Sequence, residues 1–137
     1  MADAIVLDAS AYLSFLLKED QTEGMEKLLE THPLFAPELL WFETANGVLT
    51  AKRSHRPGVK EVSLAQLLDV VQELPIQSVP ISAWWKKSVS LVQRYDLTFY
   101  DACYVACAMV LDLPLLTLDR KMIQVCRDED LNLVQLR

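Results

Sequence analysis

The sequence predicts an α/β protein with three layers, α/β/α, in which helices cover both faces of a central parallel sheet of four to five strands. Short runs rich in Ile, Val and Leu alternate with longer segments whose apolar residues recur at helical spacing. Strands separated by helices need crossover connections, and such connections produce a parallel sheet with helices on both faces. The length suits one domain, which we expect to span residues 1–137.

The first 54 residues predict two strands and three helices. The run AIVLD is short and apolar, and Tyr12, Leu13, Leu16 and Leu17 follow it at helical spacing. Gly47 falls inside a long helical pattern, where glycine costs roughly 1 kcal/mol relative to alanine, so we expect it to permit close packing. The expected elements are a strand at 4–8, helices at 9–19 and 21–32, a strand at 33–37 and a helix at 38–54.

The remainder continues the alternation and ends on a strand. Trp84 and Trp85 are adjacent on one expected helix, about 100° apart around its axis, so only one ring can face the core. The other lies either at an interface, where tryptophan is enriched, or on the surface as a single exposed apolar residue, which is common. The expected elements are helices at 59–74, 82–95, 98–112 and 120–128, with strands at 76–80, 113–119 and 131–136.

Composition excludes several classes of protein. The net charge of -6 argues against a broad basic surface for nucleic acid, and the most basic segment, residues 51–60 (AKRSHRPGVK), is interpreted as a solvated turn. Because no apolar run reaches 18 residues and the N-terminus lacks a basic leader, we expect a cytoplasmic protein without a membrane anchor. Three cysteines without CxxC spacing predict reduced, mostly buried thiols.

Four acidic residues occupy positions that meet in such a fold. Asp8 ends the first strand and Asp119 ends the strand at 113–119, whereas Glu43 and Asp101 lie near the starts of helices that follow strand or loop segments. Ligands of open parallel sheets bind outside the carboxyl ends of the strands. We therefore expect the four carboxylates to lie at one edge of the sheet.

Each acid also has a purely structural interpretation. Asp8 and Asp119 precede helical segments, where aspartate is a favoured N-cap. Asp101 lies three residues after Thr98, which resembles a capping box with Asp in place of Glu. For Glu43, the structural interpretation is an ordinary exposed residue on a helix. Capping does not explain, however, why all four positions fall at the same end of a parallel sheet.

Four segments in order resemble the PIN domain family, and in particular its VapC-type toxin ribonucleases. The segments are IVLDASAYLSFL, PELLWFETANGVL, LTFYDACYVACA and LLTLDRKM, and they cover nearly the whole chain. Their shared features are a strand ending in D-x-S, an E-x-x-N helix, a Y-D-A helix and a strand ending in T-x-D. The acidic site that this resemblance implies consists of Asp8, Glu43, Asp101 and Asp119, with Ser10, Asn46 and Thr117 as supporting polar residues.

The resemblance also implies a function and partners. It implies an endoribonuclease dependent on Mg²⁺ or Mn²⁺, the toxin of a type II toxin-antitoxin system, which forms a homodimer and is inhibited by a VapB-type antitoxin. Asp8, Glu43 and Asp101 would hold the metal directly, and Asp119 would bind a second ion or a bound water. Hard divalent ions prefer such oxygen ligands. The antitoxin would pack over the acidic site and a hydrophobic groove, for which the candidate residues are Leu16, Leu17, Leu39, Leu40 and Trp41.

One alternative remains open from the sequence. A PIN-like module that keeps its acids as helix caps, and that acts by binding a protein partner, would show the same pattern without nuclease activity. Binding of manganese separates the two, since a residue that serves only as a cap gains nothing from the ion.

Overall fold

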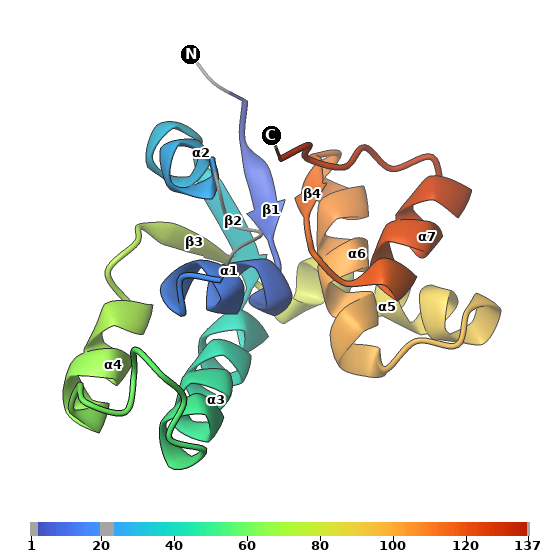
Figure 1. The fold of residues 1–137 in the computed structure, drawn as a ribbon. Helices are drawn as coiled ribbons and strands as arrows, with labels where there is room; N and C mark the ends of the chain where they lie inside the picture. Colours follow the sequence, from blue (N-terminus) through green and yellow to red (C-terminus); the bar gives the residue numbers. More distant parts are fainter. Residues whose placement is uncertain (1–2, 20–23, 137) are drawn as a thin grey trace.

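Four short parallel strands form one sheet in the order β3-β2-β1-β4. This is a computed structural model, and it describes residues 3–19 and 24–136. Helix α1 is drawn in front of the sheet and α6 behind it (Figure 1). The elements are β1 (Ile5–Leu7), α1 (Ala9–Leu16), α2 (Met25–Thr31), β2 (Leu34–Pro37), α3 (Leu39–Arg53), α4 (Leu64–Val71), β3 (Ile76–Val79), α5 (Ile81–Arg94), α6 (Phe99–Leu111), β4 (Leu115–Leu116) and α7 (Arg120–Asp128). The predicted α/β fold is therefore confirmed.

Strand β1 lies between β2 and β4, with Val6 paired to Phe35 on one side and to Leu115 on the other. All three residues of β1 are buried, as are both residues of β4. Strands buried on both faces are continuous apolar runs rather than alternating ones, which is the pattern of these segments. The carboxyl end of β1 consequently opens into the middle of the molecule.

Helix α6 is the central helix of its layer. Every residue from Ala102 to Ala108 is buried, and the helix packs against α5, α7 and the strands. Its N-cap is Thr98, whose hydroxyl accepts a hydrogen bond from the N–H of Asp101 at 3.1 Å. Cys103, Cys107 and Cys126 are buried and free, as the sequence predicts.

Several expected elements differ from the observed ones, among them the strand expected at 113–119, which is confined to Leu115–Leu116, and the helix expected at 9–19, which ends at Leu16. The helix expected at 59–74 begins only at Leu64, because Ser63 and Gln66 form a capping box there. The closing strand expected at 131–136 is wrong as a regular strand: among the described residues it contributes one parallel bridge, between Leu133 and Leu115. Of the helix expected at 21–32, residues 21–23 lie outside the described part, and α2 begins at Met25.

The two adjacent tryptophans face opposite environments, as their helical spacing requires. Trp84 is buried and its indole N–H donates to the Val79 carbonyl at 3.0 Å. Trp85 is 47% exposed and its ring lies 4.7 Å from the Phe99 ring, centroid to centroid. The prediction that one ring faces the core is confirmed, and the interface role of Trp85 remains a prediction.

One predicted groove residue is wrong. Leu40 is fully buried, because it shares the inward face of α3 with Thr44, Val48 and Ala51 at spacings of three to four residues. The other four candidates, Leu16, Leu17, Leu39 and Trp41, are partly exposed. In the described part of the chain, no helix is long and apolar enough to cross a bilayer.

Gly47 is a point of close approach between α1 and α3. A Cβ built on Gly47 would lie 2.4 Å from Cδ2 and 3.3 Å from Cγ of Leu13, closer than van der Waals contact allows. The expected role of this glycine in close packing agrees with the structure.

We predict that Gly47→Ala destabilises the protein, because the overlap with Leu13 costs more than the roughly 1 kcal/mol that alanine gains in helix propensity. On a Leu13→Ala background the overlap is absent, so the same substitution should stabilise by up to about 1 kcal/mol. Urea unfolding of the four proteins measures both differences. The same sign on the two backgrounds would contradict this account of Gly47.

Candidate metal centre

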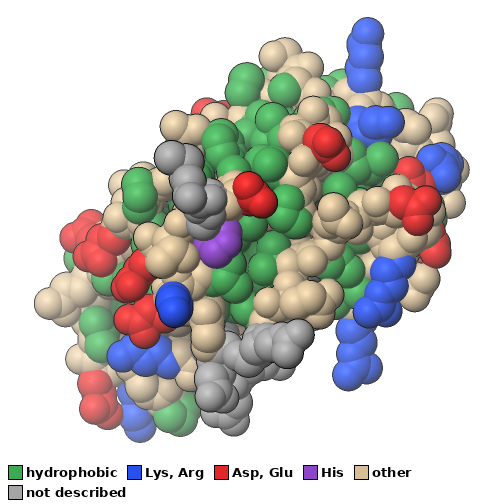
Figure 2. Space-filling model, turned by 90° about the horizontal axis from the view of Figure 1, so that it is seen from above, with side chains coloured by type: hydrophobic (Ala, Val, Ile, Leu, Met, Phe, Trp, Pro, Cys, Tyr) green, Lys and Arg blue, Asp and Glu red, His purple; other side chains and the backbone are tan. Residues whose placement is uncertain are grey.

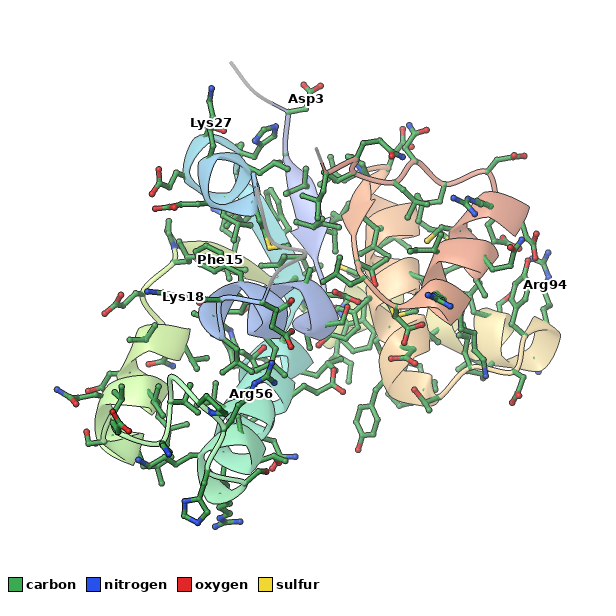
Figure 3. The ribbon with its side chains drawn as sticks, in the orientation of Figure 1. Asp3, Phe15, Lys18, Lys27, Arg56 and Arg94 are labelled. Atoms are coloured by element: carbon green, nitrogen blue, oxygen red, sulfur yellow. The ribbon has the colours of Figure 1, made fainter. Side chains whose placement is uncertain are left out.

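The four acids lie at the carboxyl end of the sheet. Asp8 directly follows β1 and Asp119 precedes α7, whereas Asp101 is in the first turn of α6 and Glu43 is in the second turn of α3. Side-chain oxygens gather in the space between α1, α3 and α6 (Figure 3). The topology therefore brings residues from both halves of the chain to one edge.

Asp8 is the most deeply buried of the four, with 2% of its surface exposed. Its Oδ1 accepts the N–H of Ala11 and the hydroxyl of Ser10, each at 2.9 Å, and its Oδ2 accepts the hydroxyl of Thr117. Burial raises the pKa of Asp8 to about 6, although these hydrogen bonds favour the ionised form. The interpretation of Asp8 as the N-cap of α1 agrees with the structure. The capping side chain is at the same time a buried carboxylate.

Ser10 and Thr117 join the two loops that carry Asp8 and Asp119. The Ser10 hydroxyl oxygen accepts the N–H of Leu118 at 3.1 Å, and the Thr117 hydroxyl oxygen accepts the N–H of Asp119 at 3.1 Å. Each hydroxyl also donates to Asp8. Both residues therefore lie where the sequence expects supporting groups, and they fix the end of β1 to the end of β4.

Asp119 and Asp101 differ in how they are held. Oδ1 of Asp119 accepts the N–H of Met122 at 2.9 Å, so Asp119 caps α7. Asp101 is the third residue of α6, and the hydroxyl of the N-cap Thr98 accepts its N–H, so this half of the expected capping box is present. Burial, and after it the negative charge of Asp119, raises the pKa of Asp101, while Thr98 and Lys121 lower it.

Glu43 accepts a hydrogen bond from a residue on another helix, and the sequence analysis did not identify that residue. The hydroxyl of Tyr104, on α6, donates to Oε1 of Glu43, on α3, at 2.6 Å. Burial raises the pKa of Glu43, the Tyr104 hydrogen bond lowers it, and the charge of Asp101 raises it. Tyr104 lies three residues after Asp101, on the same helix face, and that spacing is a signal that could have identified it.

Asn46 is exposed one turn beyond Glu43. Within the described ranges, its side chain makes no hydrogen bond to any of the four acids. The shared helix face with Glu43 thus places Asn46 at the outer margin of the acidic group rather than inside it.

The PIN domain family model matches residues 5–128. The chain belongs to the PIN domain family. It is 32% identical over 126 residues to ribonuclease VapC1 of Mycobacterium tuberculosis, covering 88% of this chain and 89% of that protein. It is 28% identical over 122 residues to ribonuclease VapC3 of Pyrobaculum aerophilum, covering 86% and 91%. The family expected from the four sequence segments is confirmed.

A solved structure supports the same PIN fold. The crystal structure of VapBC2 from Rickettsia felis, bound to a DNA fragment from its promoter, has a TM-score of 0.65 to this chain at 16% sequence identity. The match covers 98% of this chain and 99% of the matched one. At this identity, the likeness concerns the fold alone.

The donor set of this PIN domain fits a hard divalent cation. Its four acids offer only oxygen, and Mg²⁺ and Mn²⁺ prefer oxygen ligands. The carboxylates also repel one another in pairs: Asp119 raises the pKa of Asp8 and of Asp101, and Asp101 raises that of Glu43. Within residues 3–19 and 24–136, no group of three or more Asp, Glu, His or Cys side chains is placed to hold a metal ion in the observed conformation. The fit therefore rests on the donor chemistry and on this mutual repulsion.

Basic residues contribute little to this edge. Lys121 lies 3.6 Å from Asp96 and lowers the pKa of Asp101. The basic segment at 51–60 follows the far end of α3, and its Arg56 pairs with Glu19 beside α1 (Figure 3). On the face at which the strands begin, acidic and basic side chains are scattered, and neither sign forms one patch (Figure 2).

The raised pKa of Asp8 predicts a pH dependence of stability. Because the folded protein holds the Asp8 proton up to about pH 6, whereas the unfolded chain releases it near 3.8, stability falls as pH rises through this window. The difference corresponds to about 3 kcal/mol when fully developed. Asp8→Asn lacks this titration, so its stability relative to the original protein should rise by roughly 2 kcal/mol from pH 4 to pH 7.

Urea unfolding at both pH values, with EDTA present, measures this difference. Asp69→Asn, at an exposed position on α4, is the matched control and should show no such rise. A constant difference between Asp8→Asn and the original protein across the range would contradict the assignment.

Proposed function

We propose that this PIN domain is a divalent-metal-dependent endoribonuclease, the toxin of a type II toxin-antitoxin system, with residues 1–137 forming the single domain. The observation that carries the proposal is a group of carboxylates from four segments at one edge of the sheet, three of which have pKa values raised by burial and by one another. Perturbed acids of this kind cluster at functional sites. The family membership and the ribonuclease names of the relatives support the same reaction.

In this proposal Asp8, Glu43 and Asp101 hold Mg²⁺ or Mn²⁺ directly, and Asp119 binds a second ion or a bound water. A divalent cation at such a site lowers the pKa of its water and neutralises charge on the scissile phosphate. Ser10 and Thr117 keep Asp8 in place through the hydrogen bonds described above. Asn46, at the exposed margin, would position the substrate.

The substrate is RNA, and the metal supplies the local positive charge that the chain lacks. A protein with a net charge of -6 gains little from general phosphate attraction. A divalent cation among the acids offsets part of their negative charge and offers a phosphate oxygen a direct ligand position at that edge only. We accordingly expect cleavage of single-stranded RNA, whose backbone can enter a confined site.

A catalytically inactive binding module is the second candidate. The capping hydrogen bonds favour this candidate, because Asp8 and Asp119 have structural roles that need no metal. Capping gives no account of Glu43, a half-buried carboxylate within α3 that Tyr104 on α6 holds at the same edge. For that reason we favour the nuclease.

The test is Asp101→Asn, measured in two ways. Without metal, the variant should unfold at an equal or higher temperature, because a half-buried charge that Asp119 repels is removed. With Mn²⁺ it should lose cleavage of a single-stranded RNA oligonucleotide by orders of magnitude. The original protein should melt at a higher temperature in millimolar Mn²⁺, since an ion that binds only the folded state stabilises it by RT ln(1 + [L]/Kd).

Asp69→Asn serves again as the matched control, with unchanged cleavage and an unchanged response to Mn²⁺. If Asp101→Asn cleaves RNA at the original rate, the catalytic assignment of Asp101 is contradicted. A melting temperature that does not respond to Mn²⁺ in the original protein would favour the inactive binding module.

For the partners we propose an apolar segment of a VapB-type antitoxin and a second copy of this chain, in the cytoplasm. Trp41 and Phe42 on α3 and Leu68 on α4 line a hollow of about 240 Å³, and Phe42 is 74% exposed. Together with the partly exposed Leu16, Leu17 and Leu39, these residues would receive the antitoxin. Large exposed apolar surface of this kind is typical of protein interfaces.

The second copy would dock on α5. Ile81, Trp85 and Val89 are exposed at intervals of four residues, so they form one apolar stripe along that helix. Light scattering at micromolar concentration should return about twice the monomer mass of 15.6 kDa. Trp85→Lys should return the monomer, whereas Val110→Lys, an equally exposed apolar position on α6, should not. A strict monomer for the original protein would remove the dimer proposal.

A further inference from the structure

Glu43 receives no support from the start of its own helix. Asp8 and Asp119 each accept a backbone N–H at the start of a helix, which fixes the carboxylate close to the main chain. Glu43 is the fifth residue of α3, beyond the helix positions whose N–H groups lack a partner. It also carries one more rotatable bond than aspartate. Its position therefore depends on a contact from another element.

Tyr104 supplies that contact, and it is rigid. The residue is 1% exposed, and its neighbours from Ala102 to Ala108 on α6 are all buried. Its hydroxyl reaches Oε1 of Glu43 at 2.6 Å, the one hydrogen bond of the Glu43 side chain in the described part of the chain. Oε1 is thereby engaged by a fixed donor, and within residues 3–19 and 24–136 no hydrogen bond is made to Oε2.

We propose that Tyr104 is a positioning residue for the metal centre, which holds Glu43 by Oε1 and presents Oε2 to the ion. The inference rests on the proposed function, because it assigns a role toward the same divalent cation. Partners that orient a metal ligand from behind usually change metal affinity or activity by 10- to 100-fold when removed. Tyr104 would act in this way without touching the ion or the RNA.

A purely structural explanation also exists, in which Glu43 merely satisfies a buried hydroxyl. Buried tyrosine hydroxyls generally find an acceptor, and Tyr12 is an example in this chain: it is fully buried and donates to the Val71 carbonyl at 2.6 Å. Tyr12 and Tyr104 thus form a matched pair with the same burial and the same bond length. They differ in that only the Tyr104 acceptor is an acid of the proposed centre.

The experiment compares Tyr104→Phe with Tyr12→Phe in the full chain. Each removes one buried hydroxyl and keeps the ring, so both should lower the melting temperature by similar amounts in EDTA. The Kd for Mn²⁺, measured by calorimetry in the absence of RNA, should rise about 10-fold for Tyr104→Phe. Tyr12→Phe should keep the original Kd within about twofold. In cleavage of single-stranded RNA, Tyr104→Phe should need more Mn²⁺ for half-maximal rate.

A second measurement tests whether the effect passes through Glu43. On a Glu43→Gln background, Tyr104→Phe should cause no further rise in the Kd for Mn²⁺, because residues that act through one another are not additive. If the original protein binds Mn²⁺ and Tyr104→Phe binds it as tightly as Tyr12→Phe does, the positioning role is overturned while the proposed function stands. If the original protein binds no Mn²⁺, both are overturned.

Discussion

A carboxylate buried at the end of the central strand organises the acidic edge of this protein. Asp8 accepts hydrogen bonds from Ser10 and Ala11 in the first turn of α1 and from Thr117 in the segment between β4 and α7. Without such donors a buried charge would be far less favourable than a neutral side chain. The same hydrogen bonds hold the end of β1 beside the segment between β4 and α7. They therefore help to position Asp119 at the start of α7.

The assembled acids oppose the stability of the fold. Asp8, Glu43 and Asp101 all have raised pKa values, with burial as the first cause and a neighbouring carboxylate as a further one. A sequence selected for stability alone would not place like charges together, because neutral residues of similar shape would cost less. Sites that must bind a cation accept this cost, since the bound ion compensates the repulsion. The repulsion among these carboxylates thus favours a cation-binding role for this edge of the sheet.

Local sequence patterns predicted the parts of the structure that local forces determine. The helix at 120–128 was placed at its observed bounds, and Asp8, Ser10 and Thr117 lie together because D-x-S and T-x-D follow adjacent parallel strands. The Tyr104–Glu43 contact was missed, because it joins residues 61 positions apart on two helices that only the complete fold brings to the same edge of the sheet. The expected strand at 131–136 failed for a similar reason: its apolar residues pack on the core while only Leu133 aligns with β4.

Capping and metal binding are compatible roles for the same aspartates. Oδ1 of Asp119 accepts the Met122 N–H, which leaves Oδ2 free of that bond, and each carboxylate oxygen has more than one lone pair. A cap restricts the side chain to one orientation, so less entropy is lost when a ligand binds. This also explains the choice of residue types. Aspartate suits Asp8 and Asp119, which lie beside a helix start, whereas Glu43 lies within a helix and needs the longer side chain to reach the centre, with Tyr104 restricting it in place of a cap.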